Sequence, residues 1–299
     1  MDMLRVAGLR KRFGGKSVLN GLDLAVPEHS VFGFIGKNGA GKTTTMKLTL
    51  GLLTADAGEI WVNGEKVRYG QTATNRWIGY LPDVPEFYPF MTAPEYLRFC
   101  GEITGIPAAE NRKRGGELLE LVGLQGEKHR IKGFSRGMKQ RLGIAQALLN
   151  RPKLLICDEP TSALDPVGRK EILDLLLTVR EQTTVLFSTH ILSDVERICT
   201  DVAFLNRGTA DLQGRLADIK SRYRSDEYLL ETEDEAGLLA LRQAFPTMRQ
   251  VGRNQLAFSE KECAVPDALR FVADRQIALL KMERVEPTLE SLFMEVAEP

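Results

Sequence analysis

The chain has 299 residues, 43% of them hydrophobic and 27% charged, and its 40 basic residues balance its 40 acidic ones. This length can bury a full core and divide into more than one unit, and the balanced charge argues against a nucleic-acid-binding protein. No apolar stretch approaches the roughly 20 residues that cross a bilayer, and residues 1–5 lack a signal-peptide core. Four scattered cysteines, none in a Cys-x-x-Cys pair, favour reduced cytosolic thiols over disulfides or zinc.

Residues 2 to about 83 are expected to form short strands with glycine-containing turns between them. The apolar run 31–35 is one such strand. A phosphate-binding loop follows it, made of Gly36, Lys37, Asn38, Gly39, Ala40, Gly41, Lys42 and Thr43, and Thr44 continues into a helical pattern. The glycines let backbone N–H groups turn inward around phosphates, and the helix directs its positive end at the same oxygens. In this pattern Lys42 reaches the outer phosphates and Thr43 ligates magnesium.

After about residue 83 the pattern changes from strands to helices. The segment Thr92 to Glu95 is a capping box that opens a helix, and Glu117 to Val122 continues the helical pattern. Further on, Ser135 is expected to cap another helix. That helix start can bind phosphate as the first one does, or it can be an ordinary capped helix.

Residues 154–159 form an apolar run that ends in two carboxylates, Asp158 and Glu159. The pattern is typical of a buried parallel strand that delivers acids at its carboxyl edge. There Asp158 can hold magnesium through water and Glu159 can orient the attacking water, which is most of what phosphoryl transfer requires from a protein. The alternative is an ordinary solvated turn.

After about Leu216 the pattern changes. The expected elements are a strand at 227–233, a helix at 235–245, hairpin strands at 248–254 and 255–261, a helix at 266–275 and a strand at 278–286. The order β-α-β-β-α-β predicts a small ferredoxin-like domain. Acidic residues outnumber basic ones from Ser221 to Pro299, which argues against binding of nucleic acid or anionic lipid there. The expected role is regulatory or dimer-supporting, with a purely structural cap as the alternative.

These motifs, in this order, resemble the nucleotide-binding subunit of ATP-binding-cassette (ABC) transporters over about residues 2–215. The resemblance assigns three further positions. Phe13 stands where the family has an aromatic ring that stacks on adenine, and Ser162 to Asp165 match the loop that communicates across the dimer. His190 matches the switch histidine that contacts the γ-phosphate.

Two positions depart from the usual pattern of the family. The signature is usually Leu-Ser-Gly-Gly-Gln, whereas this chain has Arg136 for the first glycine and Met138 for the glutamine. Ser135 and Gly137, which carry the phosphate contacts, are kept. A magnesium-contacting glutamine is replaced by Asp83, whose carboxylate accepts as an amide oxygen does and adds a charge.

Both departures resemble the drug and bacitracin exporter branch, as does the C-terminal segment Glu286 to Glu295. The resemblance implies an α/β fold, with a P-loop NTPase cassette over residues 1–216 that includes a helical subdomain at about 84–150. A small α+β domain of ferredoxin-like type is expected over 217–299. The protein is then an ATPase that uses ATP and Mg²⁺.

By the same resemblance, ATP hydrolysis powers a membrane exporter, and separate transmembrane permease subunits hold the protein at the cytoplasmic face of the membrane. The segment Val84 to Phe90 lies where the family docks its permease, although a rigid packed loop has the same composition. Two copies are expected to close around two ATP, because each site takes the Ser135 motif from the opposite subunit. The alternative is a soluble ABC ATPase that acts on ribosomes or DNA. Such proteins carry paired cassettes, coiled-coil insertions or basic arms, which this sequence lacks.

Overall fold

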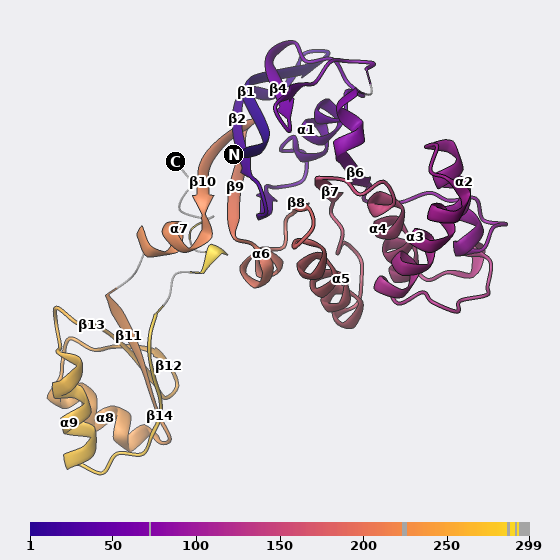
Figure 1. Ribbon diagram of the computed structural model, residues 1–299. Helices are drawn as coiled ribbons and strands as arrows, with labels where there is room; N and C mark the ends of the chain where they lie inside the picture. Colours follow the sequence, from indigo (N-terminus) through magenta and orange to yellow (C-terminus); the bar gives the residue numbers. More distant parts are fainter. Residues whose placement is uncertain (72, 223–225, 286–287, 291, 293–299) are drawn as a thin grey trace. The chain divides into compact units, whose positions relative to one another are not determined.

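The computed structural model describes residues 1–299 except 72, 223–225, 286–287, 291 and 293–299. The chain separates into two compact units, Met1–Ala217 and Asp218–Met294 (Figure 1). The boundary is one residue from the position expected after residue 216. It falls within α7 (Leu216–Arg222). Among the described residues, no helix combines the length and apolar character needed to span a membrane.

An antiparallel sheet forms the N-terminal part of the first unit. Its strands lie in the order β2-β1-β4-β5, with β1 at Asp2–Phe13, β2 at Lys16–Pro27, β4 at Ala57–Val62 and β5 at Glu65–Lys66. The first two strands have 12 residues each, so the expectation of short strands was wrong for this hairpin. Register shifts and left-handed Gly8 and Gly21 let the hairpin bend without ending.

The second sheet has six strands and lies at the centre of this unit. Its order is β10-β9-β3-β8-β7-β6, with β3 at Val31–Ile35, β6 at Ile78–Leu81, β7 at Leu154–Asp158, β8 at Thr184–Thr189, β9 at Asp201–Asn206 and β10 at Thr209–Arg215. All neighbours are parallel except β10 and β9. Every residue of β3, β7 and β8 is buried, as expected for a parallel sheet covered on both faces. The carboxyl ends of these strands meet at one edge, where α/β sheets place their ligands.

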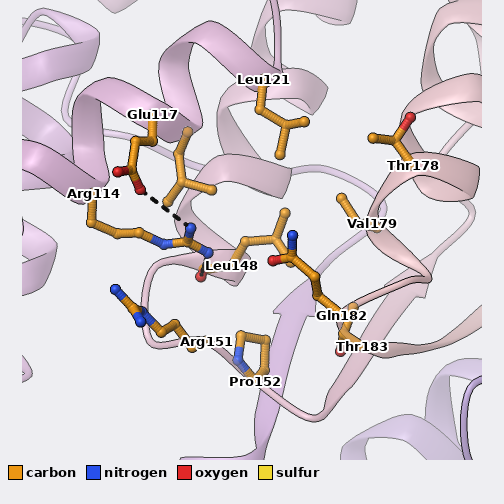
Figure 2. Close-up of a pocket in the computed structure, with 11 residues that line it drawn as sticks. Arg114, Glu117, Leu121, Leu148, Arg151, Pro152, Thr178, Val179, Gln182 and Thr183 are labelled. Carbon is orange, nitrogen blue, oxygen red and sulfur yellow. Dashed lines mark hydrogen bonds and ion pairs between the residues drawn. The ribbon is translucent and has the colours of Figure 1, made fainter.

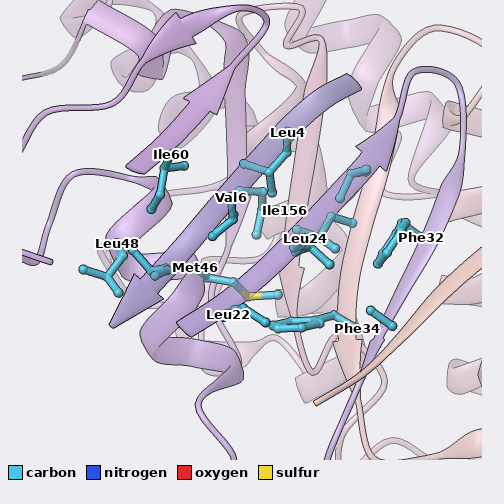
Figure 3. Packing of buried hydrophobic residues seen from close by; sticks show 14 of the residues in the cluster. Leu4, Val6, Leu22, Leu24, Phe32, Phe34, Met46, Leu48, Ile60 and Ile156 are labelled. Atoms are coloured by element: carbon cyan, nitrogen blue, oxygen red, sulfur yellow. The ribbon is translucent and has the colours of Figure 1, made fainter. Parts of the chain in front are cut away.

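Helices α1 (Lys42–Thr49), α5 (Pro166–Val179) and α6 (Leu192–Ile198) accompany this sheet, together with the 3₁₀ turn η1 (Ala73–Trp77). A hydrophobic core joins α1 to both sheets (Figure 3). It contains Leu4 and Leu24 of the first sheet, Phe34 and Ile156 of the second and Met46 of α1, and each is at most 2% exposed. Burying one such side chain contributes about 1.5–3 kcal/mol. The core therefore fixes α1, and with it the loop that precedes the helix.

A group of helices follows β6 (Figure 1). It contains α2 (Ala93–Ile103), α3 (Ala108–Leu121) and α4 (Arg136–Leu148), with a 3₁₀ turn η2 (Ile131–Gly133). The capping box is confirmed, because the Thr92 N–H donates to Glu95 Oε2 at 2.8 Å and the Glu95 N–H donates to Thr92 Oγ1 at 3.5 Å. The described helices of this stretch lie between residues 93 and 148.

The second unit has the predicted ferredoxin-like topology. Its elements are β11 (Glu227–Thr232), α8 (Glu235–Ala244), β12 (Arg249–Gly252), β13 (Gln255–Ser259), α9 (Val265–Asp274) and β14 (Leu279–Arg284). The four strands form one antiparallel sheet in the order β12-β13-β11-β14. Leu230, Leu238 and Phe258 belong to a core of its own. The segment Glu286 to Glu295 lies largely outside the described residues.

Candidate nucleotide site

The phosphate loop lies between the end of β3 and the start of α1. Its conformation requires glycine at position 41, where φ is 114° and a Cβ would come within 2.7 Å of Leu19 Cδ2. Within the loop the Lys42 side chain is 6% exposed. Its Nζ donates to the Gly36 carbonyl at 2.6 Å and lies 3.1 Å from Glu159 Oε1. The loop therefore holds a buried cation at the positive end of α1.

The two carboxylates at the end of β7 contact the start of α1 and the end of β8. Asp158, 3% exposed, accepts from Thr43 Oγ1 at 2.7 Å and from Ser188 Oγ at 2.6 Å. The Glu159 N–H donates to the same Ser188 Oγ at 3.0 Å, and Glu159 Oε2 lies 3.0 Å from His190 Nδ1. Burial and bonding of this kind are not those of a solvated turn.

Two neighbouring groups are kept neutral by their surroundings. Burial, and after it the charge of Asp158, raises the pKa of Tyr80 on β6 to about 12. Burial also raises the pKa of the Cys157 thiol, which precedes Asp158. A thiol in such surroundings is inert as a nucleophile. The chemistry of this edge therefore rests on carboxylates, a lysine, a histidine and hydroxyl groups.

The phosphate loop and the two carboxylates line a pocket of about 510 Å³, within the usual range for small-molecule sites. Its walls are formed by Phe13, Lys16, Val18, Asn38, Gly39, Gly41, Lys42, Thr43, Thr44, Asp83, Asp158 and Glu159. The exposed ring of Phe13 stands at the end of β1. Lys16 and Val18 of β2 were missed by the sequence analysis, because only the hairpin brings them beside the loop.

Most of the predicted residues are gathered here. Gly36, Lys37 and Ala40 belong to the loop itself, and His190 joins the pocket residues through Glu159. Ser135 and Gly137 do not line the pocket. They begin α4, where the expected cap is confirmed, since Ser135 Oγ accepts from the Met138 N–H at 3.2 Å.

The two departures from the family pattern contact each other. An Asp83 carboxylate oxygen lies 3.4 Å from the Arg136 guanidinium, and Gln140 Nε2 donates to the Asp83 carbonyl at 2.9 Å. Both partners are on α4, whereas Asp83 also lines the nucleotide pocket. The start of α4 is thus tied to the pocket through one acidic residue.

Oxygen donors at the loop suit a magnesium ion. Thr43 Oγ1 and the Asp158 carboxylate lie together, and Mg²⁺ is usually held by one or two carboxylates plus substrate phosphates. Within the described part of the chain there is no cluster of three or more His, Cys, Asp or Glu that could hold a metal. The residues present therefore fit a metal shared with phosphates and do not form a protein cage.

The segment 84–90 is packed against α2 and also exposes apolar side chains. Phe87 packs edge-on against Tyr96 of α2 at 5.0 Å between ring centroids, and Tyr88 packs against Phe99 at 5.4 Å. Yet Val84, Tyr88 and Phe90 are exposed. The loop is held by packing and still presents apolar side chains to the outside.

A second pocket of about 510 Å³ lies beside α3 (Figure 2). Arg114 and Glu117 of α3 stand on one side, Val179 of α5 on another, and Arg151 below them. None of the nucleotide-site residues predicted from the sequence is in its described lining. Size does not distinguish the two pockets, whereas the chemistry of their linings does.

Comparison with known families gives two matches along the chain. Residues 19–162 match the family described as ABC transporter, and residues 214–297 match the C-terminal domain of DrrA1-3-like ATP-binding proteins. An uncharacterized ABC transporter ATP-binding protein of Bacillus subtilis is 42% identical over 78% of this chain and 78% of its own length. A bacitracin transport ATP-binding protein of Bacillus licheniformis is 38% identical, over 79% of this chain and 78% of its own. A linearmycin resistance ATP-binding protein of Bacillus subtilis is 33% identical over 98% and 97%.

Solved structures agree with these relatives. The ATP-binding subunit of an ABC transporter superposes with a TM-score of 0.65 at 33% identity, covering 74% of this chain and 93% of that one. A dimeric ATP-binding cassette in a post-hydrolysis state, bound to ADP and phosphate, superposes with a TM-score of 0.64 over 72% of this chain and 99% of that one. At 24% identity, the second likeness shows the fold alone.

Proposed function

The chain belongs to the family of ABC transporter ATP-binding subunits, which are ATPases, and from this premise we propose that it hydrolyses Mg²⁺-bound ATP to power an exporter. The observation that carries the proposal is the bonded group formed by Lys42, Thr43, Asp158, Glu159 and His190. A buried cation, a metal-binding pair and a water-orienting acid are the parts that phosphoryl transfer requires.

Binding of the nucleotide is assigned to the loop and its surroundings. Backbone N–H groups of the loop and the start of α1 hold the phosphates, Lys42 reaches the outer ones, and Phe13 stacks on adenine. Thr43 and Asp158 hold magnesium, with Asp83 at the same pocket contributing a further oxygen. When bound, the metal neutralises charge on the phosphate oxygens.

Hydrolysis is assigned to Glu159 and His190. Glu159 orients the attacking water and accepts hydrogen bonds from it, while the His190 ring beside Oε2 holds the carboxylate and contacts the γ-phosphate. Lys42 already lies beside Glu159 Oε1, so one lysine places the acid and the phosphate next to each other. Positioning and charge supply the catalysis.

A second copy is proposed to complete each site. Ser135 and Gly137 form a helix start suited to phosphate, yet they do not line the pocket of their own chain. Two chains that close face to face around two ATP would place each Ser135 motif on the other's nucleotide, with Ser162 to Asp165 between the sites.

Export, and attachment to a permease, are proposed from the relatives. Their names refer to bacitracin transport and linearmycin resistance, which suggests that this protein powers removal of a compound of that kind. The exposed apolar side chains of 84–90 offer a surface for a transmembrane permease. Such a partner would hold the chain at the cytoplasmic face of the membrane.

Phosphate release by the purified protein tests the enzymatic part. Replacing Glu159 by Gln removes the charge that orients water and keeps the side chain's size, so turnover should fall at least about 100-fold while ATP still binds. Glu181→Gln, at an exposed turn, is the matched control and should behave as the wild type. Normal hydrolysis by Glu159→Gln would remove Glu159 from its role.

Co-purification tests the biological part. The tagged protein, isolated from gently solubilised membranes of its own cells, should bring down a permease. Recovery of ribosomes or DNA in place of a membrane protein would refute the transport role and support a soluble ABC ATPase.

A further inference from the structure

The chain segments that follow β7 and β8 are joined at three successive levels. At the strands' ends Ser188 Oγ donates to Asp158 Oδ1 at 2.6 Å, and next His190 Nδ1 lies 3.0 Å from Glu159 Oε2. Beyond both, Thr161 Oγ1 donates to Asp194 Oδ2 at 2.7 Å. The first two levels belong to the nucleotide site, and the third lies outside the pocket lining.

Asp194 is an ionisable group buried in the third level. It stands in the first turn of α6 and is 2% exposed, and Thr161 is 1% exposed. Arg169 of α5 donates from Nε to Asp194 Oδ1 at 2.6 Å and from its terminal nitrogen to Ser193 Oγ at 2.9 Å. A carboxylate this deeply buried persists only when it is paired and hydrogen-bonded. The bonds therefore fix the first turns of α5 and α6 and the loop after β7 to one another.

The backbone on either side of Thr161 is strained. Glu159 has a φ of 47° and Ala163 a φ of 52°, in the left-handed region that non-glycine residues rarely adopt. Thr161 stands midway between them, inside a turn in which the Ser162 N–H donates to the Glu159 carbonyl at 3.0 Å. Strained backbone persists at functional sites when the surroundings over-determine it. The buried Thr161 to Asp194 bond is such a constraint.

We propose that Asp194 is a positioning residue for hydrolysis, which acts through Thr161 on Glu159 and through the first turn of α6 on His190. Glu159 lies two residues before Thr161, and His190 lies four residues before Asp194. The bond between Thr161 and Asp194 therefore helps to hold the acid and the histidine at their contact distance. This inference rests on the proposed roles of Glu159 and His190 and adds the group that holds them together.

A merely structural role for the buried pair makes a different prediction. A structural pair affects stability, and its loss reduces the amount of folded protein without changing the chemistry of each folded molecule. A positioning pair affects kcat and leaves the KM for ATP unchanged, because Lys42, Thr43 and the loop that bind the nucleotide do not touch it.

The test is steady-state hydrolysis by the full-length protein with single substitutions, with kcat expressed per ATP-binding molecule as counted by calorimetry, so that loss of folded protein does not enter kcat. Thr161→Val keeps the shape and removes the hydroxyl, so kcat should fall about tenfold while KM changes less than about twofold. Thr161→Ser keeps the hydroxyl, and its kcat should lie within about threefold of the wild type. The control is Thr178→Val on α5, where the hydroxyl donates to Asp174 O of its own helix, and it should leave kcat unchanged.

Each outcome is decisive. An unchanged kcat in Thr161→Val, with or without a lower unfolding temperature, would overturn the proposal, and so would failure of Thr161→Ser to recover activity. If Thr161→Val does not fold, Arg169→Lys applies, since lysine keeps the charge beside Asp194 and loses the second bond to Ser193. There a fall in kcat at constant KM supports the proposal, and an unchanged kcat overturns it. A wild-type protein that hydrolyses no ATP would instead refute the proposed function, and this inference with it.

Discussion

Two helix starts in this chain are suited to phosphate, and they differ in completeness. At the start of α1, no side chain caps the backbone N–H groups, and Lys42, Asp158 and Glu159 surround them. At the start of α4, Ser135 already occupies the Met138 N–H, and the following Arg136 is part-exposed. The first is a built pocket, whereas the second is a capped helix end whose residues do not line that pocket.

The difference shows what each end can do alone. Free N–H groups at a helix start attract an anion, and a buried cation beside a cavity strengthens that binding. The α1 end has both, so one chain should bind ATP by itself. The residues that begin the α4 end do not line that pocket, and we propose that this end contributes when a second copy brings a nucleotide to it. Substitutions at the two helix starts should therefore have different effects on ATP binding and on hydrolysis.

The largest effect is expected at the complete end. Lys42→Ala removes the buried cation that contacts the Gly36 carbonyl and Glu159, and it should weaken ATP binding about 100-fold, since hydrogen bonds to charged groups contribute roughly 1.5–3 kcal/mol. Calorimetry with ATP and Mg²⁺ measures it. Lys47→Ala, on the exposed side of the same helix, should bind as the wild type. Equal affinities for the two variants would contradict the assignment of Lys42.

A smaller effect, with a different signature, is expected at the incomplete end. Asp caps helices as well as Ser does, but Ser135→Asp adds a negative charge where the partner's phosphates are proposed to lie. Hydrolysis should fall roughly tenfold or more, while ATP affinity of the isolated chain stays unchanged. Ser135→Asn caps without the charge and should stay within about threefold of the wild type.

The same variants can be followed by light scattering in a Glu159→Gln background. With ATP and Mg²⁺ this protein should run as a dimer, and the added Ser135→Asp change should leave it monomeric. A dimer that forms equally well with aspartate at position 135 would argue against the shared site.

The first helix start could be predicted from the sequence because its parts are local. The strand, the glycine loop and Lys42 follow one another within about a dozen residues, so the pattern itself encodes the geometry. The acids of β7 were predicted on the same basis, from an apolar run with two carboxylates at its end. The ferredoxin-like order of the second unit was also predicted, because alternation and helical period distinguish its elements.

Contacts between distant segments could not be predicted in this way. Ser188 bonds to Asp158 only because β7 and β8 are neighbours in the sheet. In the sequence Asp194 is one acidic residue in a short helix, and only the fold buries it against Arg169. Sequence patterns report which face of an element is apolar, whereas the partner that satisfies a buried charge depends on topology.

A smaller effect is expected where the two helix starts are connected. The Asp83 to Arg136 pair is part-exposed, so solvent screening limits it to less than about 1 kcal/mol. Asp83→Asn keeps an oxygen but removes the charge, and the Mg²⁺ concentration for half-maximal hydrolysis should rise about threefold. Arg136→Gln leaves the Asp83 charge unopposed and should slightly lower the Mg²⁺ concentration for half-maximal hydrolysis. Shifts of the same sign in both variants would exclude a role for Asp83 near the metal.

The smallest effect on ATP binding is expected from removal of the second unit. That unit has its own core, which includes Leu230, Leu238 and Phe258, and the residues that line the nucleotide pocket all lie before His190. A fragment of residues 1–222, which keeps α7, should therefore stay soluble and bind ATP within about threefold of the full chain by calorimetry. The Lys42→Ala substitution, made in both the full chain and the fragment, is the control for a folded protein whose nucleotide site is lost. Because a cut through a cooperative core exposes apolar surface, aggregation of the fragment would show that the two units depend on each other for stability. A soluble fragment without ATP binding would instead mean that the second unit shapes the α1 end, and the pocket around Lys42 could then no longer be regarded as complete within the first unit.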